Sequence, residues 1–202
     1  MRGLEQLRKS VADGFRGFEL FFQPIVRVGQ DVPFMAESLL RFKTTDGEMV
    51  SPVEFIPILE ESGLIIPVGK WLIDRALSMC AECQKTQPEF HISVNLSYVQ
   101  ILKSDVCEEI EHWIEFYNLK PESLMVELTE SGYVDDNSPA VKRLWDRLRE
   151  YGVMIALDDF GTGYSNFQLI SSMVPNIVKL DRSFTVKALQ NTFEHQLMDH
   201  II

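Results

Sequence analysis

Oxygen-bearing side chains stand at the ends of four short apolar runs, and the fourth run ends in two aspartates. The runs are Met35–Glu37, Ile92–Asn95, Leu124–Glu127 and Ile155–Asp159. A fifth stretch, Ile177–Asp181, carries the cation Lys179. Apolar runs of this length predict buried strands, and the carboxyl ends of parallel strands in a barrel meet at one mouth. Because neighbouring strands lie only about 4.8 Å apart, we expect these side chains to converge.

Carboxylates that are buried together repel one another, so they need a cation that compensates their charge. The candidate ligands offer oxygen atoms, the donors that Mg²⁺ and Mn²⁺ prefer; they are Glu37, Asn95, Glu127, Asp158 and Asp159. Asp158 can bridge two ions while Asp159 binds the second, and ions about 3.5–4 Å apart suit the hydrolysis of a phosphodiester. The pattern therefore predicts a site for divalent metal ions.

Lys179 is the one cation at a strand end in this set. One interpretation is a structural ion pair with Asp181 or Asp159. The other is a catalytic lysine that orients the attacking water and stabilises charge in the transition state. The residues alone leave both interpretations open.

Other motifs carry weaker signals. Gly161 and Gly163 invite a phosphate-binding interpretation, but the third glycine of a dinucleotide fingerprint would fall at Asn166. We interpret these glycines as a sharp bend after the two aspartates. Cys80 and Cys83 lie in a helical pattern without a second pair, which favours packing residues in a reducing compartment over a zinc site. The four histidines are scattered, and none is assigned as a ligand.

The composition is that of a globular protein, since 46% of the 202 residues are hydrophobic and the net charge is −11. A strongly acidic chain does not adhere to DNA or to anionic membranes, so we expect no DNA partner. No apolar run reaches the roughly 18 residues of a membrane span, and Met1–Glu5 lacks the apolar core of a signal peptide. We predict a cytoplasmic domain without direct membrane insertion, whose parent protein can still be anchored.

The elements that must position the candidate ligands alternate between strands and helices. The expected strands are 18–28, 34–42, 90–96, 123–128, 153–158 and 176–181. The expected helices are 4–15, 53–62, 68–85, 104–117, 139–151, 165–171 and 183 to the end. This alternation predicts an α/β fold, either a barrel or a doubly wound sheet. Polar residues at nearly every strand end favour the barrel.

The expected elements do not complete a barrel. A complete TIM-type barrel has eight strands and typically about 250 residues. We therefore predict a TIM-type (β/α) barrel that is truncated after its sixth strand and the following helix. Residues 1–17 would form an N-terminal helix and linker, and residues 18–202 the incomplete barrel domain.

Seven sequence blocks follow one another along the chain: Phe22–Val26, Ala36–Phe42, Phe55–Gly63, Ser93–Ser97, Glu127–Ser131, Asp158–Ser165 and Val178–Asp181. In order and spacing they resemble the motifs of the EAL family, cyclic-di-GMP phosphodiesterases that open the cyclic dinucleotide to linear pGpG. The resemblance covers essentially residues 18–202. It implies a barrel of the EAL type whose first strand runs antiparallel to the others.

The resemblance also implies roles for individual residues. One Mg²⁺ or Mn²⁺ ion would be held by Glu37, Asn95, Glu127 and Asp158, and a second by Asp158 and Asp159. The catalytic group would comprise Lys179, Glu37 and Asp159. The substrate contacts would come from Gln23, Leu39, Arg41 and Asp181, and Glu130 would stabilise the loop after Asp159. Family partners are a second copy in a homodimer and an upstream regulatory or GGDEF domain.

Two departures from the family pattern bear on activity. Ser38 replaces the alanine of the Glu-Ala-Leu signature, for which we expect a mild effect. The family's next metal-binding glutamate and its final strand would lie beyond Ile202, which leaves the second ion incompletely coordinated. Two functions therefore stay open. The chain is either a cyclic-di-GMP phosphodiesterase domain, impaired or inactive in isolation, or an inactive module that binds cyclic-di-GMP or a protein.

Overall fold

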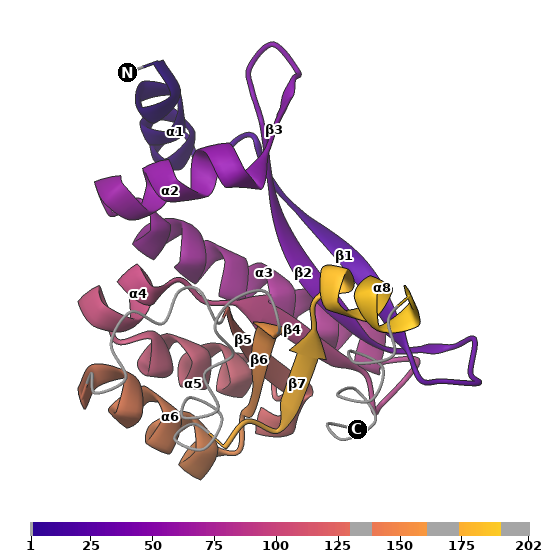
Figure 1. Cartoon of the computed structure of the whole chain (residues 1–202). Helices are drawn as coiled ribbons and strands as arrows, with labels where there is room; N and C mark the ends of the chain where they lie inside the picture. The colour runs from indigo at the N-terminus through magenta and orange to yellow at the C-terminus, as the bar shows by residue number, and fades with distance from the viewer. Residues whose placement is uncertain (1, 130–138, 161–173, 191–202) are drawn as a thin grey trace.

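The fold is a mixed α/β arrangement around one sheet of seven strands, seen in a computed structural model (Figure 1). The structure describes residues 2–129, 139–160 and 174–190. The strands are β1 (Phe18–Val26), β2 (Pro33–Lys43), β3 (Met49–Val50), β4 (His91–Asn95), β5 (Leu124–Thr129), β6 (Met154–Phe160) and β7 (Ile177–Leu180). Six of them confirm the expected strands with shifts of a few residues at their ends, and β3 was not predicted.

The strand order is β1-β2-β4-β5-β6-β7, with β3 paired to β2. β1 and β2 are antiparallel, and each later neighbour in this order is parallel. The reversed first strand agrees with the EAL-type arrangement. The strands follow chain order without the reversal of a doubly wound sheet, so the barrel is confirmed over that alternative. Parallel neighbours bring their carboxyl ends to one edge, and that edge carries the candidate ligands.

The helices that the structure describes lie around the sheet and beyond its ends (Figure 1). They are α1 (Arg2–Ala12), α2 (Pro52–Ser62), α3 (Ile65–Gln84), α4 (Tyr98–Lys103), α5 (Val106–Phe116), α6 (Pro139–Tyr151) and α8 (Arg182–Gln190), with a 3₁₀ turn at Pro121–Ser123. The bounds of α6 match the prediction. The expected helix at 165–171 and the final stretch from residue 191 lie outside the described residues.

The expected helix at 104–117 is confirmed as α5, whereas the short α4 that precedes it was not predicted. Ser97 and Gln100 form a capping box that starts α4 directly after β4. Asp105 then accepts a hydrogen bond from the backbone N–H of Glu108 and starts α5. Each cap satisfies backbone groups that a helix end otherwise leaves unpaired, so the two short helices are stable as separate elements.

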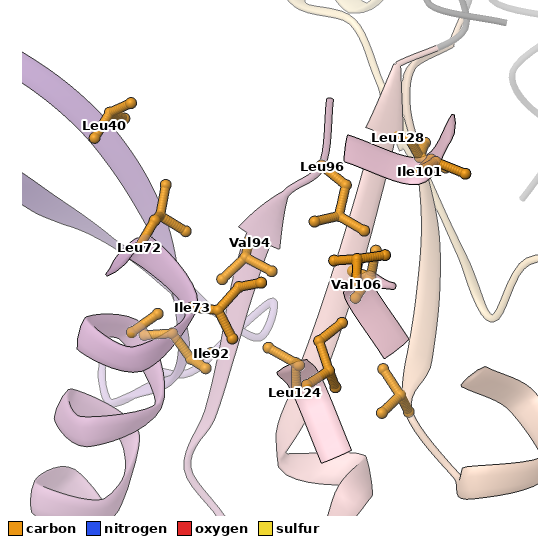
Figure 2. Packing of buried hydrophobic residues seen from close by; sticks show 14 of the residues in the cluster. Leu40, Leu72, Ile73, Ile92, Val94, Leu96, Ile101, Val106, Leu124 and Leu128 are labelled. Carbon is orange, nitrogen blue, oxygen red and sulfur yellow. The ribbon is translucent and has the colours of Figure 1, made fainter. Parts of the chain in front are cut away.

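The main core lies between the outer face of the sheet and the helices. Figure 2 shows Leu72 and Ile73 of α3 beside Ile92 and Val94 of β4, all of them buried. A smaller apolar cluster, composed of Met35, Met125 and Ala156, comes from the opposite side chains of β2, β5 and β6. Side chains alternate across a strand, so these residues lie on the inner face of the barrel. Among the described helices, none is long and apolar enough to cross a membrane.

The N-terminal helix is attached to the barrel domain by side-chain packing. Leu7 of α1 is only 1% exposed and belongs to the main core. Gly17 follows in a left-handed conformation, where an added Cβ would stand 2.6 Å from the carbonyl oxygen of Lys43. Only glycine fits this close approach. The division into residues 1–17 and 18–202 stays a prediction.

Candidate metal centre

Three carboxylates from three strands converge at the mouth of the barrel. Glu37 comes from β2, Glu127 from β5 and Asp158 from β6, and one oxygen of each lies within 4.8 Å of the others. They point inwards because each stands two positions after an inward-facing residue of the Met35–Met125–Ala156 cluster. The structure therefore brings together three of the five predicted metal ligands in the way the strand pattern indicated.

The ammonium group of Lys179 lies among these three carboxylates. Its Nζ is 2.9 Å from Glu37 Oε2 and 3.1 Å from Asp158 Oδ2, and it also contacts Glu127 Oε2. The lysine thus forms ion pairs with carboxylates that the sequence pattern assigned to the metal. The partners considered for a purely structural ion pair were instead Asp181 and Asp159.

Burial and neighbouring charges shift the pKa values of Glu127 and Lys179. Glu127 is fully buried, and the loss of water raises the pKa of its carboxyl to about 6, although the bond from Lys179 acts in the opposite direction. Burial would lower the pKa of Lys179, but its contacts with Glu127 and Glu37 outweigh that effect and raise it. Two carboxylates about 4 Å apart repel by about 4 kcal/mol at an effective dielectric constant of 20. The carboxylates therefore need a cation at their centre.

The donor atoms fit a hard divalent cation. Asn95 stands beside the carboxylates, and its Nδ2 donates to Glu37 Oε1 at 3.1 Å. Glu127 Oε1 and the Ser93 hydroxyl are both buried and complete no hydrogen bond of good geometry within the described residues, although the hydroxyl is near enough to lower the pKa of Glu127. A buried carboxylate oxygen without a partner is costly. A bound cation would compensate it, and an all-oxygen set suits Mg²⁺, Mn²⁺ or Ca²⁺ rather than a soft metal.

Asp159 lies beside the cluster of three carboxylates but is not a member of it. Its backbone is left-handed, with φ of 56°, and its N–H donates to Asp158 Oδ1 at 2.9 Å. The pairing of β6 with β7 is irregular between Leu157 and Phe160. Burial, followed by the negative charges of Asp158 and Asp181, raises the pKa of Asp159. A further cation next to Asp159 would relieve the same repulsion.

The predicted substrate contacts lie along the first two strands. Gln23 is exposed and directly opposite Glu37 in the antiparallel pair. Arg41 places its guanidinium 5.7 Å from the centre of the Phe21 ring and donates to the carbonyl oxygen of Leu40. A pocket of about 280 Å³ is lined by Leu39, Arg41 and Asn95 among others. Leu39 and Arg41 thus share a pocket with Asn95, which in turn contacts Glu37 of the carboxylate cluster.

Of the two remaining predicted residues, the structure describes one. The Asp181 carboxylate accepts a hydrogen bond from the backbone N–H of Ser183 at 2.7 Å, at the start of α8. That contact orients the carboxylate at the end of β7, two residues after Lys179. Glu130, predicted to stabilise the loop after Asp159, lies outside the described residues.

Sequence reasoning assigned no role to several polar groups near the centre. Ser38 is buried, and its hydroxyl donates to the carbonyl oxygen of Ser93, which links β2 to β4. The Ser97 hydroxyl donates to Glu60 Oε1 at 2.6 Å. For Ser93 a signal existed, because it stands two residues before Asn95 and therefore on the same face of its strand.

The family model described as "EAL domain" matches residues 4–202. The chain belongs to the EAL domain family. It is 31% identical over 184 residues to the cyclic di-GMP phosphodiesterase PdeF of Escherichia coli, covering 91% of this chain and 24% of that protein. It is 34% identical over 169 residues to the cyclic di-GMP phosphodiesterase PA2567 of Pseudomonas aeruginosa, covering 84% of this chain and 29% of that protein.

A solved structure supports the EAL fold independently. The phosphodiesterase PaMucR in complex with c-di-GMP superimposes with a TM-score of 0.85 at 27% identity, covering 98% of this chain and 79% of that one. This EAL chain spans about a quarter of the length of the curated relatives it matches. The relatives therefore contain long segments that have no counterpart in the 202 residues.

Proposed function

We propose that this EAL domain hydrolyses cyclic-di-GMP to linear pGpG by two-metal-ion catalysis, in bacterial second-messenger signalling. One observation carries the proposal. Carboxylates from three separate strands and one lysine converge at the barrel mouth, in a family whose relatives are named cyclic di-GMP phosphodiesterases. A buried carboxylate such as Glu127 is stable only beside a compensating cation, and this supports a site built to hold positive charge.

The proposed roles follow the positions of the side chains. Glu37, Asn95, Glu127 and Asp158 hold one Mg²⁺ or Mn²⁺ ion, and Asp158 and Asp159 hold the second. Bound ions of this kind polarise the phosphoryl oxygens, lower the pKa of water and neutralise the leaving oxygen. Lys179 orients the attacking water and balances the negative charge of the transition state. Glu37 and Asp159 also belong to this catalytic group.

The substrate is anionic while the chain is strongly acidic, so local cations must receive it. Arg41 stands four residues beyond Glu37 on the same strand, and we assign it and Gln23 to the phosphates. Leu39 lines the adjoining pocket and would contact the apolar face of a base. Asp181 completes the proposed substrate contacts, and Glu130 is proposed to stabilise the loop that follows Asp159.

The wider setting is also proposed. An upstream regulatory or GGDEF domain fits the much greater length of the relatives, and we also propose a homodimer. A cytoplasmic location fits the three cysteines, which are all free thiols, because disulfides are rare in reducing compartments. Cyclic-di-GMP is the proposed ligand in that setting.

The test is a hydrolysis assay on the purified full-length parent protein with cyclic-di-GMP and either Mn²⁺ or Mg²⁺, followed by chromatography of the nucleotides. The expected result is metal-dependent formation of pGpG that EDTA abolishes. The matched control is Asp146→Asn, which removes an exposed carboxylate of α6 and should leave the rate unchanged. Binding of cyclic-di-GMP without turnover would replace the proposal by the inactive binding module, and neither binding nor turnover would contradict both.

A further inference from the structure

The contacts of Lys179 match the chemistry of a bound cation. An ammonium group has three N–H donors and no acceptor, and here it meets one oxygen from each of three carboxylates. Those carboxylates are Glu37, Glu127 and Asp158, which come from three different strands. The same three residues form the only group of three or more potential metal-binding side chains in the described part of the chain.

An ammonium group and a divalent ion cannot use these oxygens together. Mg²⁺ binds oxygen at about 2.0–2.1 Å, which places neighbouring ligand oxygens only about 3 Å apart. The Nζ of Lys179 stands 2.9 Å from Glu37 Oε2 and 3.1 Å from Asp158 Oδ2, among oxygens spread over as much as 4.8 Å. The oxygens must therefore close in around the smaller ion, and the ammonium group must leave the space between them.

We propose that Lys179 is an internal counter-ion that competes with the first metal ion for Glu37, Glu127 and Asp158. The inference rests on the proposed function, because that function assigns the metal to these carboxylates. In the metal-free protein the ammonium group holds the three strand ends together. Metal affinity is then reduced by the fraction of molecules in which the lysine still occupies the site.

The side chain has a route out of the site. Lys179 lies on β7, which ends the strand order among the described residues, and its side chain is 23% exposed at the barrel mouth. Its four-carbon stem is flexible and its ammonium group is readily hydrated. Withdrawal from the carboxylates leaves the ammonium group at the same mouth, where the proposed function requires it to meet water. Lys179 can thus act as the counter-ion in the metal-free protein and contact water in the metal-bound protein.

The test compares Mn²⁺ binding by calorimetry in the wild-type chain, in Lys179→Met and in Lys187→Met. Lys187 is an exposed lysine of α8, so its variant is a control for the loss of one positive charge. Lys179→Met should bind Mn²⁺ about tenfold more tightly, as expected if the lysine occupies the site in about nine molecules of ten. The control should bind like the wild type.

A second measurement separates competition from plain charge repulsion. In EDTA, Lys179→Met should melt about 2–4 °C or more below the wild type, because its carboxylates lack a counter-ion. Saturating Mn²⁺ should remove that deficit. If Lys179 only repels the metal ion, Lys179→Met would bind Mn²⁺ more tightly but melt like the wild type in EDTA. A lower melting temperature that persists in Mn²⁺ would indicate lost packing. Either result overturns the proposal.

The outcomes separate this inference from the function on which it rests. If the wild type binds Mn²⁺ and Lys179→Met binds equally or more weakly, competition is wrong and the metal site stands. If neither protein binds Mn²⁺, the metal site is wrong and the competition with it. If Lys179→Met does not fold, amine acetylation of the wild type replaces it. Mn²⁺ should then raise the labelling of Lys179 relative to Lys187, and an unchanged ratio would overturn the proposal.

Discussion

Two layers of side chains fill the inside of this EAL barrel on the same three strands, yet their chemistry is opposite. In each strand a residue of the lower layer is followed two positions later by one of the upper layer: Met35 and Glu37, Met125 and Glu127, Ala156 and Asp158. The lower layer is apolar and closely packed. The upper layer is charged and depends on a cation. The strands therefore separate stability from function by a step of two residues along one face.

The lower layer should carry the larger share of stability. Met125 is 1% exposed between its neighbours, so Met125→Ala should lower the free energy of unfolding by about 2–5 kcal/mol, through lost burial and the cavity left behind. Urea denaturation of the variant and the wild type measures this difference. Below its melting temperature the variant should retain metal-dependent hydrolysis.

Met79→Ala is the matched control for that experiment. Met79 is an exposed residue of α3, and surface substitutions usually change stability by less than about 0.5 kcal/mol. A loss of hydrolysis in folded Met125→Ala, at unchanged Mn²⁺ affinity, would contradict the separation of the two layers.

The upper layer should carry the activity. Asp158→Asn keeps the shape of the side chain but removes the charge that lies 3.1 Å from Lys179. We expect kcat/KM to fall by about 100-fold or more, since even partners outside the ligand shell typically change activity by 10–100-fold. That factor corresponds to about 2.7 kcal/mol in the barrier. Steady-state kinetics with Mn²⁺ test it, and a rate within a few-fold of wild type would contradict the assignment of Asp158 as a metal ligand.

Glu127 should make the metal-free protein sensitive to pH. Its pKa is about 6 in the folded protein against an ordinary value of 4.5, so the folded state binds this proton more tightly than the unfolded chain. The stability that this adds is complete below pH 4.5 and is lost as the pH rises through about 6. A shift of this size is worth roughly 2 kcal/mol.

The measurement is the free energy of unfolding in EDTA at several pH values, for the wild type and for Glu127→Gln. As the pH rises from 4.5 through about 6, the wild type should lose stability relative to Glu127→Gln, because glutamine stays neutral. A constant difference would show that Glu127 titrates normally in the folded state.

Ser93 should give the smallest effect. It stands two residues before Asn95 on the inner face of β4 and is fully buried, but its hydroxyl completes no hydrogen bond of good geometry within the described residues. Ser93→Ala should therefore change the free energy of unfolding by less than about 1 kcal/mol and leave hydrolysis near the wild-type rate. If thermal melting and kinetics instead show losses like those of Asp158→Asn, the site depends on its uncharged polar side chains as much as on its carboxylates.

The layers explain how much the sequence could reveal. Apolar runs that end in Glu37, Asn95, Glu127 and Asp158 predicted both the strands and the convergence of their ends, because parallel strands share one mouth. The bounds of α6 were also predictable, since its buried residues recur at helical spacing: Val141, Leu144, Trp145 and Leu148.

Other features were not predictable from these patterns. An alternating strand has the same pattern in either direction, so the reversal of β1 followed only from the family resemblance. The two-residue strand β3 is too short to carry a period. The contact of Lys179 with three carboxylates depends on a long side chain, whose conformation the local sequence does not determine.

The left-handed backbone at Asp159, with φ of 56°, limits which amino acids this position accepts. Glycine, asparagine and aspartate adopt that conformation most readily, whereas branched and bulky side chains are strongly disfavoured. A carboxylate at this point is available from only two residue types, and glutamate lacks the short polar side chain that eases the left-handed turn. Aspartate is therefore the one residue that suits both the left-handed backbone and the proposed contact with a metal ion. In a saturation library at position 159, folding should favour glycine, asparagine and aspartate, whereas metal-dependent hydrolysis should require aspartate.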